Sequence, residues 1–111
     1  MDLDREALLK LYKTMTTIRH FEERGIPETG QRGMSASVHS SAGPEAVATG
    51  VCANLTDEDY IGSTHRGHGH CIAKGVDVKQ MMAELFGRST GPNKGKGGLL
   101  LFSFLSNCSL F

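Results

Sequence analysis

The sequence predicts a mostly helical α/β fold with one or more short strands. Residues 4–24 and 78–86 each carry apolar side chains at the three- and four-residue spacings of a helix with one buried face. Between them, residues 60–63 are typical of a short strand, and a glycine-rich turn and a helix-like segment follow. A chain of 111 residues is long enough for one domain with a modest core.

Residues 4–24 are predicted to form an amphipathic helix. Asp2 or Asp4 can accept a hydrogen bond from a free backbone amide of the first turn, and Gly25 can end the helix. The apolar side chains that share the predicted buried stripe are Leu8, Leu11, Tyr12, Met15 and Ile18.

The next segment, residues 25–43, is rich in glycine and serine and contains Pro27, so it predicts a loop with one short extended piece around residues 37–39. Gly43-Pro44-Glu45 is typical of a helix start, because proline suits the first helical position and an acidic side chain suits the positive end of the helix dipole. The run EAVATGVCANL continues this helix in small residues, which allow another backbone or a partner chain to approach closely.

Residues 64–75, THRGHGHCIAKG, follow the predicted strand and hold three histidines, one arginine and three glycines. Asp77 and Gln80 then form a predicted capping box, and the apolar face of the last helix ends at Gly87. Residues 88–98, RSTGPNKGKGG, are a basic glycine-rich loop.

Composition excludes several functional classes. Twelve positive and twelve negative side chains balance, so no overall field attracts nucleic acid or an anionic membrane. The three cysteines contain no C-x-x-C pair, which fits a reducing cytosol better than a disulfide framework. The N-terminal MDLDREALLK lacks the apolar centre of a secretory signal, and the longest apolar run is far shorter than the roughly 20 residues of a membrane span. We therefore expect a cytoplasmic protein.

Residues 99–111, LLLFSFLSNCSLF, differ from the rest of the chain because they carry no charge, no sustained alternation and no turn signal. An exposed apolar tail would promote association. These residues are therefore either a buried terminal strand or a non-native tail, from a frameshift or a retained intron, on a truncated chain. We favour the non-native tail and divide the chain into residues 1–98 and 99–111.

The histidine-rich stretch has three possible uses. His65, His68, His70 and Cys71 could bind zinc, but structural zinc sites usually combine two ligand pairs from separate segments, and here all four candidates lie in one turn without a nearby acidic residue in the sequence. We therefore assign no metal ligand.

The second use is binding of an anion. The order of strand, turn and helix places free backbone amides at a helix start, Gly67 and Gly69 permit close approach of the backbone, and Arg66 offers a planar fork suited to phosphate. Lys94 and Lys96 could add charge. The third alternative is a surface loop with solvated histidines. Separately, His39 precedes the helix that starts at residue 43, where it is either a core or capping residue or a group that protonates a carbonyl oxygen.

Three blocks together resemble one enzyme family: VHSSAGPEAVATGV, DEDYIGSTHRGHGHCIAKGVD and MMAELFGRSTGPNKGKGG. In this order and spacing they resemble the α subunit of thiamine diphosphate-dependent decarboxylating dehydrogenases, which serve the pyruvate, branched-chain 2-oxoacid and acetoin complexes. The resemblance spans about residues 8–98. The THRGHGHCIAKG form is most similar to the acetoin type, whereas pyruvate enzymes tend to carry a YRAHG form.

The resemblance implies the N-terminal part of a thiamine diphosphate-binding α/β fold, in an α2β2 assembly whose cofactor lies between α and β subunits. It implies that Arg66 contacts the diphosphate and that His65 takes the place of the family's diphosphate-contacting tyrosine. His39 and His68 would be catalytic residues on the substrate side. The β subunit would supply the glutamate that activates the cofactor, and the acyl unit from acetoin or pyruvate would pass to a lipoyl group of the acyltransferase component.

The chain also departs from the family. Pro44 stands where the family usually has glutamine, and LLLFSFL follows KGKGG where the family continues with a Ser-Met-His block. The family's Gly-Asp-Gly…Asn motif, which binds Mg²⁺ and diphosphate, would lie further downstream. We therefore expect the 111-residue chain alone to be inactive and to bind thiamine diphosphate weakly. Two alternatives are a truncated, non-catalytic chain that retains only partner-contacting helices and an independent small anion- or metal-binding module.

Overall fold

The computed structural model describes residues 3–25, 27–28, 42–64, 67–96 and 108–110. Its elements in chain order are α1 (Arg5–His20), the π-helical turn η1 (Phe21–Gly25), α3 (Glu45–Cys52), β1 (Ile61–Ser63), α4 (His68–Lys74), α5 (Val78–Leu85) and β2 (Cys108–Leu110). The prediction of a mostly helical chain with short strands is confirmed. None of the helices in the described ranges is both long and apolar enough to cross a membrane.

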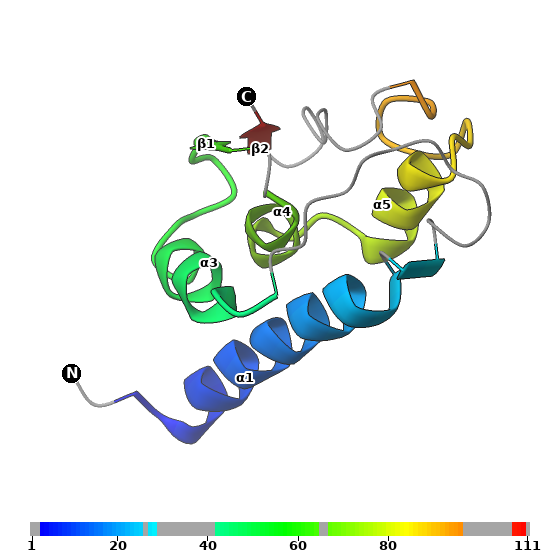
Figure 1. The fold of residues 1–111 in the computed structure, drawn as a ribbon. Coiled ribbons are helices and arrows are strands. Elements are labelled where there is room, and N and C mark those ends of the chain that lie inside the picture. Colours follow the sequence, from blue (N-terminus) through cyan, green and yellow to red (C-terminus); the bar gives the residue numbers. More distant parts are fainter. Residues whose placement is uncertain (1–2, 26, 29–41, 65–66, 97–107, 111) are drawn as a thin grey trace.

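The helices α1, α3 and α4 pack against one another, and α4 lies between α1 and the strands (Figure 1). The two strands are parallel neighbours, with Ile61 opposite Cys108 and Ser63 opposite Leu110. Because β1 ends before and α4 begins within residues 64–75, this packing holds the segments on either side of positions 64–67.

The first helix starts as predicted but ends differently. The Asp4 carboxylate caps it by accepting a hydrogen bond from the Ala7 N–H at 2.7 Å. The α-helix stops at His20, however, and the chain continues in the wider π-helical turn. That turn buries two consecutive side chains, Phe21 and Glu22. The apolar spacing in the sequence cannot distinguish a π-helical turn from a last α-helical turn, since the contacts that hold it come from another helix.

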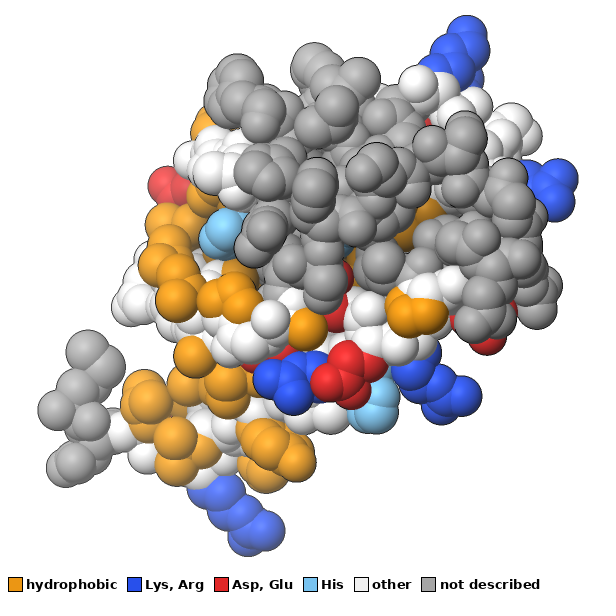
Figure 2. Space-filling view, viewed as in Figure 1, with side chains coloured by type: hydrophobic (Ala, Val, Ile, Leu, Met, Phe, Trp, Pro, Cys, Tyr) orange, Lys and Arg blue, Asp and Glu red, His pale blue; other side chains and the backbone are white. Residues whose placement is uncertain are grey.

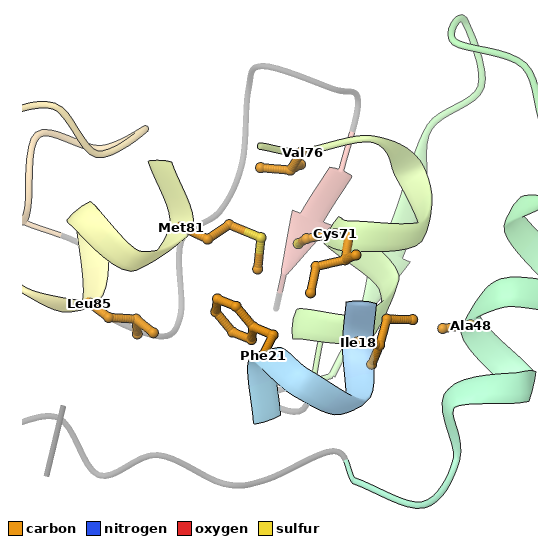
Figure 3. Close-up of a cluster of buried hydrophobic side chains, with 8 residues drawn as sticks. Ile18, Phe21, Ala48, Cys71, Val76, Met81 and Leu85 are labelled. Carbon is orange, nitrogen blue, oxygen red and sulfur yellow. The ribbon is translucent and has the colours of Figure 1, made fainter. Parts of the chain in front are cut away.

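The predicted buried stripe of the first helix is wrong at two of its five positions. Ile18 is fully buried and Leu11 and Met15 are half-buried, whereas Leu8 is 52% and Tyr12 66% exposed. The core gathers instead around the C-terminal end of α1, where Ile18 and Phe21 meet side chains of α3, α4 and α5 (Figure 3). The buried core residues are Ile18, Phe21, Ala48, Cys71, Ile72, Val76, Met81 and Leu85.

The last helix confirms the predicted Asp77 cap, with a different bonding pattern from a capping box. The Asp77 carboxylate accepts a hydrogen bond from the Lys79 N–H at 2.7 Å, one residue earlier than the Gln80 N–H of a capping box. After α5 the chain folds back over the helix. The buried Glu84 carboxylate holds this loop, because its Oε2 accepts hydrogen bonds from the N–H groups of Asn93 and Gly95, at 2.9 and 3.0 Å.

An ion pair joins α1 to the start of α3. The Arg19 guanidinium donates from Nε to Glu45 Oε1 at 2.5 Å and from Nη2 to Oε2 at 3.2 Å, and the Gly43 N–H also donates to Oε1 at 2.9 Å. The sequence suggested only that Glu45 suits the first helical turn. These hydrogen bonds lower the pKa of Glu45 from 4.5 to about 2, with the bond from Arg19 as the largest cause.

This ion pair predicts a specific loss of stability in acid. Because the folded protein holds the pKa of Glu45 at about 2 and the unfolded chain has it near 4.5, the contribution is complete above pH 4.5 and is lost as the pH falls toward 2. Urea unfolding of the wild type and Glu45→Gln should therefore differ most near neutral pH, and the difference should shrink between pH 4.5 and 2. A constant difference across that range would contradict the assigned role.

Candidate functional site

The candidate site lies between the end of β1 and the start of α4. The strand ends at Ser63 and the helix begins at His68, so the predicted order of strand and helix is confirmed. Of the four site residues predicted from the sequence, the structure describes His68. His39, His65 and Arg66 lie outside the described residues.

His68 is completely buried and faces the end of the first helix. Its Nδ1 lies 3.0 Å from Oε1 of Glu22, and both side chains have 0% exposure. An ionised carboxylate can only accept hydrogen bonds, so Nδ1 donates to Glu22. The imidazole also meets the Phe21 ring at a tilt of 58°, with the ring centroids 5.6 Å apart. Two neighbouring residues of η1 therefore set the position of this histidine.

Sequence reasoning missed Glu22. The acidic residues nearest the histidine-rich stretch in the sequence are Asp59 and Asp77, whereas Glu22 stands 46 positions before His68. The π-helical turn brings it there, because it directs Phe21 and Glu22 inward together. The FEER sequence contains a signal that could have found it, since an acidic residue next to a core phenylalanine at a helix end needs a polar partner once buried.

His70 has a different partner from His68. Its Nδ1 lies 2.6 Å from Oγ of Ser63, the last residue of β1, and burial lowers the pKa of His70. The two histidines of α4 thus use their Nδ1 atoms for separate contacts, to η1 and to β1. Within the described ranges, no three His, Cys, Asp or Glu side chains are grouped to hold a metal ion.

Gly69 serves helix packing in this structure, whereas we expected it to allow close approach of the backbone to a ligand. A Cβ atom at this position would lie 3.3 Å from Ile18 Cγ2 and 3.5 Å from the Ala48 Cβ. The absence of a side chain therefore lets α4 approach α1 and α3. The small residues of α3 were expected to let another backbone approach closely. This is confirmed here, because the small side chain of α3 that faces Gly69 is Ala48.

β1, α4 and the buried Glu22–His68 pair are the geometry that can be compared with known proteins, and the sequence assigns the chain to a family. The chain belongs to the dehydrogenase E1 component family, whose model matches residues 13–103. The resemblance noted from the three sequence blocks is confirmed.

The chain is similar to α subunits of two named enzymes. It is 54% identical over 98 residues to subunit alpha of the acetoin:2,6-dichlorophenolindophenol oxidoreductase of Bacillus subtilis, covering 88% of this chain and 29% of that relative. For the Cupriavidus necator subunit the identity is 49% over 106 residues, covering 96% of this chain and 32% of the relative. The pyruvate dehydrogenase E1 component subunit alpha of Porphyra purpurea is 42% identical over 98 residues, covering 88% of this chain and 28% of the relative. The chain thus spans less than a third of these relatives. No solved structure matches it significantly.

Proposed function

We propose that this chain is part of the α subunit of a thiamine diphosphate-dependent dehydrogenase that cleaves acetoin in the cytoplasm. Residues 1–98 would form the N-terminal part of its cofactor-binding domain, and residues 99–111 would be a tail foreign to the family. The preference for acetoin over pyruvate rests on sequence identity, which is 54% and 49% to the two acetoin-enzyme subunits and 42% to the Porphyra purpurea pyruvate dehydrogenase subunit.

The buried His68 at the start of α4 is the observation that carries the proposal. Ser63, at the end of β1, contacts His70, and His68 contacts Glu22, so the residues on either side of positions 64–67 are held in place. The guanidinium of Arg66 and the imidazole of His65, between them in the sequence, are donors suited to a diphosphate. The chemistry of the residues present therefore fits thiamine diphosphate. Mg²⁺ would be held by residues downstream of this segment.

The cofactor, when bound, supplies the electron sink for cleavage of the carbon–carbon bond. The residues of this chain bind, orient and transfer protons around it. Arg66 and His65 would bind the diphosphate, and His68 and His39 would lie on the substrate side, where an imidazole can hold a proton for the substrate oxygen. Complete burial of His68 keeps bulk water away from that proton.

Subunit contacts are also part of the proposal. The partners would be a β subunit, in an α2β2 assembly, and the lipoyl-bearing acyltransferase that receives the acyl unit. Figure 2 shows hydrophobic side chains gathered over the N-terminal half of α1 and over α3, and the large exposed ones there are Leu3, Leu8, Leu9, Tyr12, Val47 and Val51. Exposed apolar surface of this kind is typical of a face that another chain or domain covers.

Calorimetric titration with thiamine diphosphate and Mg²⁺ tests the proposal on the α–β complex, in which the β subunit is joined to the whole α subunit that contains this segment. Replacing Arg66 with alanine should weaken binding by about 10- to 100-fold, because a charge-assisted hydrogen bond contributes about 1.5–3 kcal/mol. Arg88→Ala is the matched control, since Arg88 is exposed in the loop after α5, and it should bind as the wild type does. Equal binding by Arg66→Ala and the wild type would contradict the role of Arg66. Absence of binding by the wild-type complex would favour a non-catalytic chain.

A further inference from the structure

Glu22 is a buried acidic residue for which the resemblance assigns no role. Its side chain has 0% exposure, and it reaches across from η1 to α4, where Oε1 lies 3.0 Å from Nδ1 of His68. Burying a carboxylate is costly unless hydrogen bonds compensate it. A purely packed junction between these two helices would not require an acid at this position, because Phe21 already contacts the imidazole face.

We propose that Glu22 is a positioning residue that fixes the tautomer and the ring orientation of His68 for the reaction. This inference rests on the proposed function. The carboxylate accepts from Nδ1, so the imidazole proton is held on Nδ1, and the lone pair of the neutral ring is then on Nε2. Nε2 is the atom on the opposite side of the ring from Glu22, and it is the atom that can take or return a proton at the substrate oxygen.

The ring has little freedom to adopt another orientation. Glu22 holds one edge, and the tilted Phe21 ring lies 5.6 Å from the imidazole centroid. Because these two residues are consecutive in a π-helical turn, the same local structure supplies the hydrogen bond and the apolar wall. A π-helical turn is a common way to present side chains at a functional site. Orientation of a reactive histidine by a buried carboxylate follows the same physical logic as in other acid–base sites.

Two variants test this role in the α–β complex loaded with thiamine diphosphate and Mg²⁺. Glu22→Gln keeps the size of the side chain, but its amide can donate as well as accept and no longer fixes the proton on Nδ1. We expect its kcat toward acetoin to fall by about 10- to 100-fold with little change in KM, an effect of the size seen when the hydrogen-bond partner that orients a metal-binding histidine is removed. Glu22→Asp retains the carboxylate and should recover part of kcat. Glu23→Gln, at the adjacent exposed position, is the matched control and should retain wild-type kcat.

A second readout is independent of activity. The ¹⁵N chemical shifts of His68, assigned by comparison with His68→Asn in ¹⁵N-histidine-labelled complex, report which ring nitrogen carries the proton. The wild type should show the Nδ1–H form and Glu22→Gln a mixture of both forms. An Nε2–H form in the wild type would overturn the proposal, and so would a Glu22→Gln complex that loses thermal stability but keeps kcat. If the complex lacked cofactor-dependent activity, the proposed function would fail, while the shifts would still decide whether Glu22 sets the tautomer.

Discussion

On the proposed function, replacing His68 with asparagine is expected to lower kcat of the α–β complex toward acetoin by about 100- to 10,000-fold, the usual contribution of a positioned acid–base group. Asparagine is chosen because its side-chain N–H can still donate to the Glu22 carboxylate, which would otherwise be left buried without this donor. The substitution removes the atom that corresponds to Nε2. The loss should therefore appear in kcat, and binding of thiamine diphosphate measured by calorimetry should change little.

The control is His20→Asn, since His20 is an exposed histidine at the end of α1. It should leave kcat unchanged. If His68→Asn retained more than about one tenth of the wild-type kcat, the assigned acid–base role of His68 would be wrong, because general acid–base catalysis contributes at least about 100-fold. A loss of folding in His68→Asn is separated from this result by its circular dichroism spectrum and melting temperature.

Replacing Gly95 with alanine is expected to cause a large loss of stability. Gly95 has a φ angle of 76°, and a Cβ there would lie 2.3 Å from the carbonyl carbon of Gly87 and 2.5 Å from its oxygen. Left-handed strain and overpacking against backbone each cost about 1–3 kcal/mol, so the total is about 2–6 kcal/mol. The neighbouring backbone cannot move away easily, because the Gly95 N–H also donates to the buried Glu84 carboxylate.

Gly50→Ala is the matched control for Gly95→Ala. Gly50 lies in α3, and a Cβ there would meet nothing within 4 Å. Alanine in a helix is favoured over glycine by about 0.5–1 kcal/mol, so this variant should be more stable than the wild type. Urea unfolding followed by circular dichroism measures both. Equal stabilities of Gly95→Ala and the wild type would show that the loop does not fold back on α5.

Local chemistry accounts for the features that the sequence predicted correctly. The helix caps at Asp4 and Asp77, the strand at residues 61–63 and the end of α5 before Gly87 each depend on side chains and backbone groups a few positions apart. The family resemblance was also visible, because its blocks are contiguous in the sequence.

The features that the sequence did not predict depend on distant partners. The Glu22–His68 contact joins residues 46 positions apart, and the Arg19–Glu45 ion pair joins residues 26 positions apart. The exposure of Leu8 and Tyr12 depends on where the other helices pack, which the periodicity of α1 alone does not specify. The π-helical turn also depends on a distant partner, because its inward side chains, Phe21 and Glu22, contact His68 of α4.

The roles of His39, His65 and Arg66 and the origin of residues 99–111 stay predictions. The first three lie outside the described residues. For the tail, the family match extends to residue 103, and residues 108–110 form the strand β2 that pairs with β1.

Reduction of 2,6-dichlorophenolindophenol by the α–β complex tests the central claim most directly, because the most similar proteins described above are named for this reaction with acetoin. The dye should be reduced when acetoin, thiamine diphosphate and Mg²⁺ are all present, and kcat/KM should be higher for acetoin than for pyruvate. Omission of thiamine diphosphate should abolish the reaction. Two results would contradict the account. The complex could fail to reduce the dye with either acetoin or pyruvate, or it could reduce the dye equally well without thiamine diphosphate.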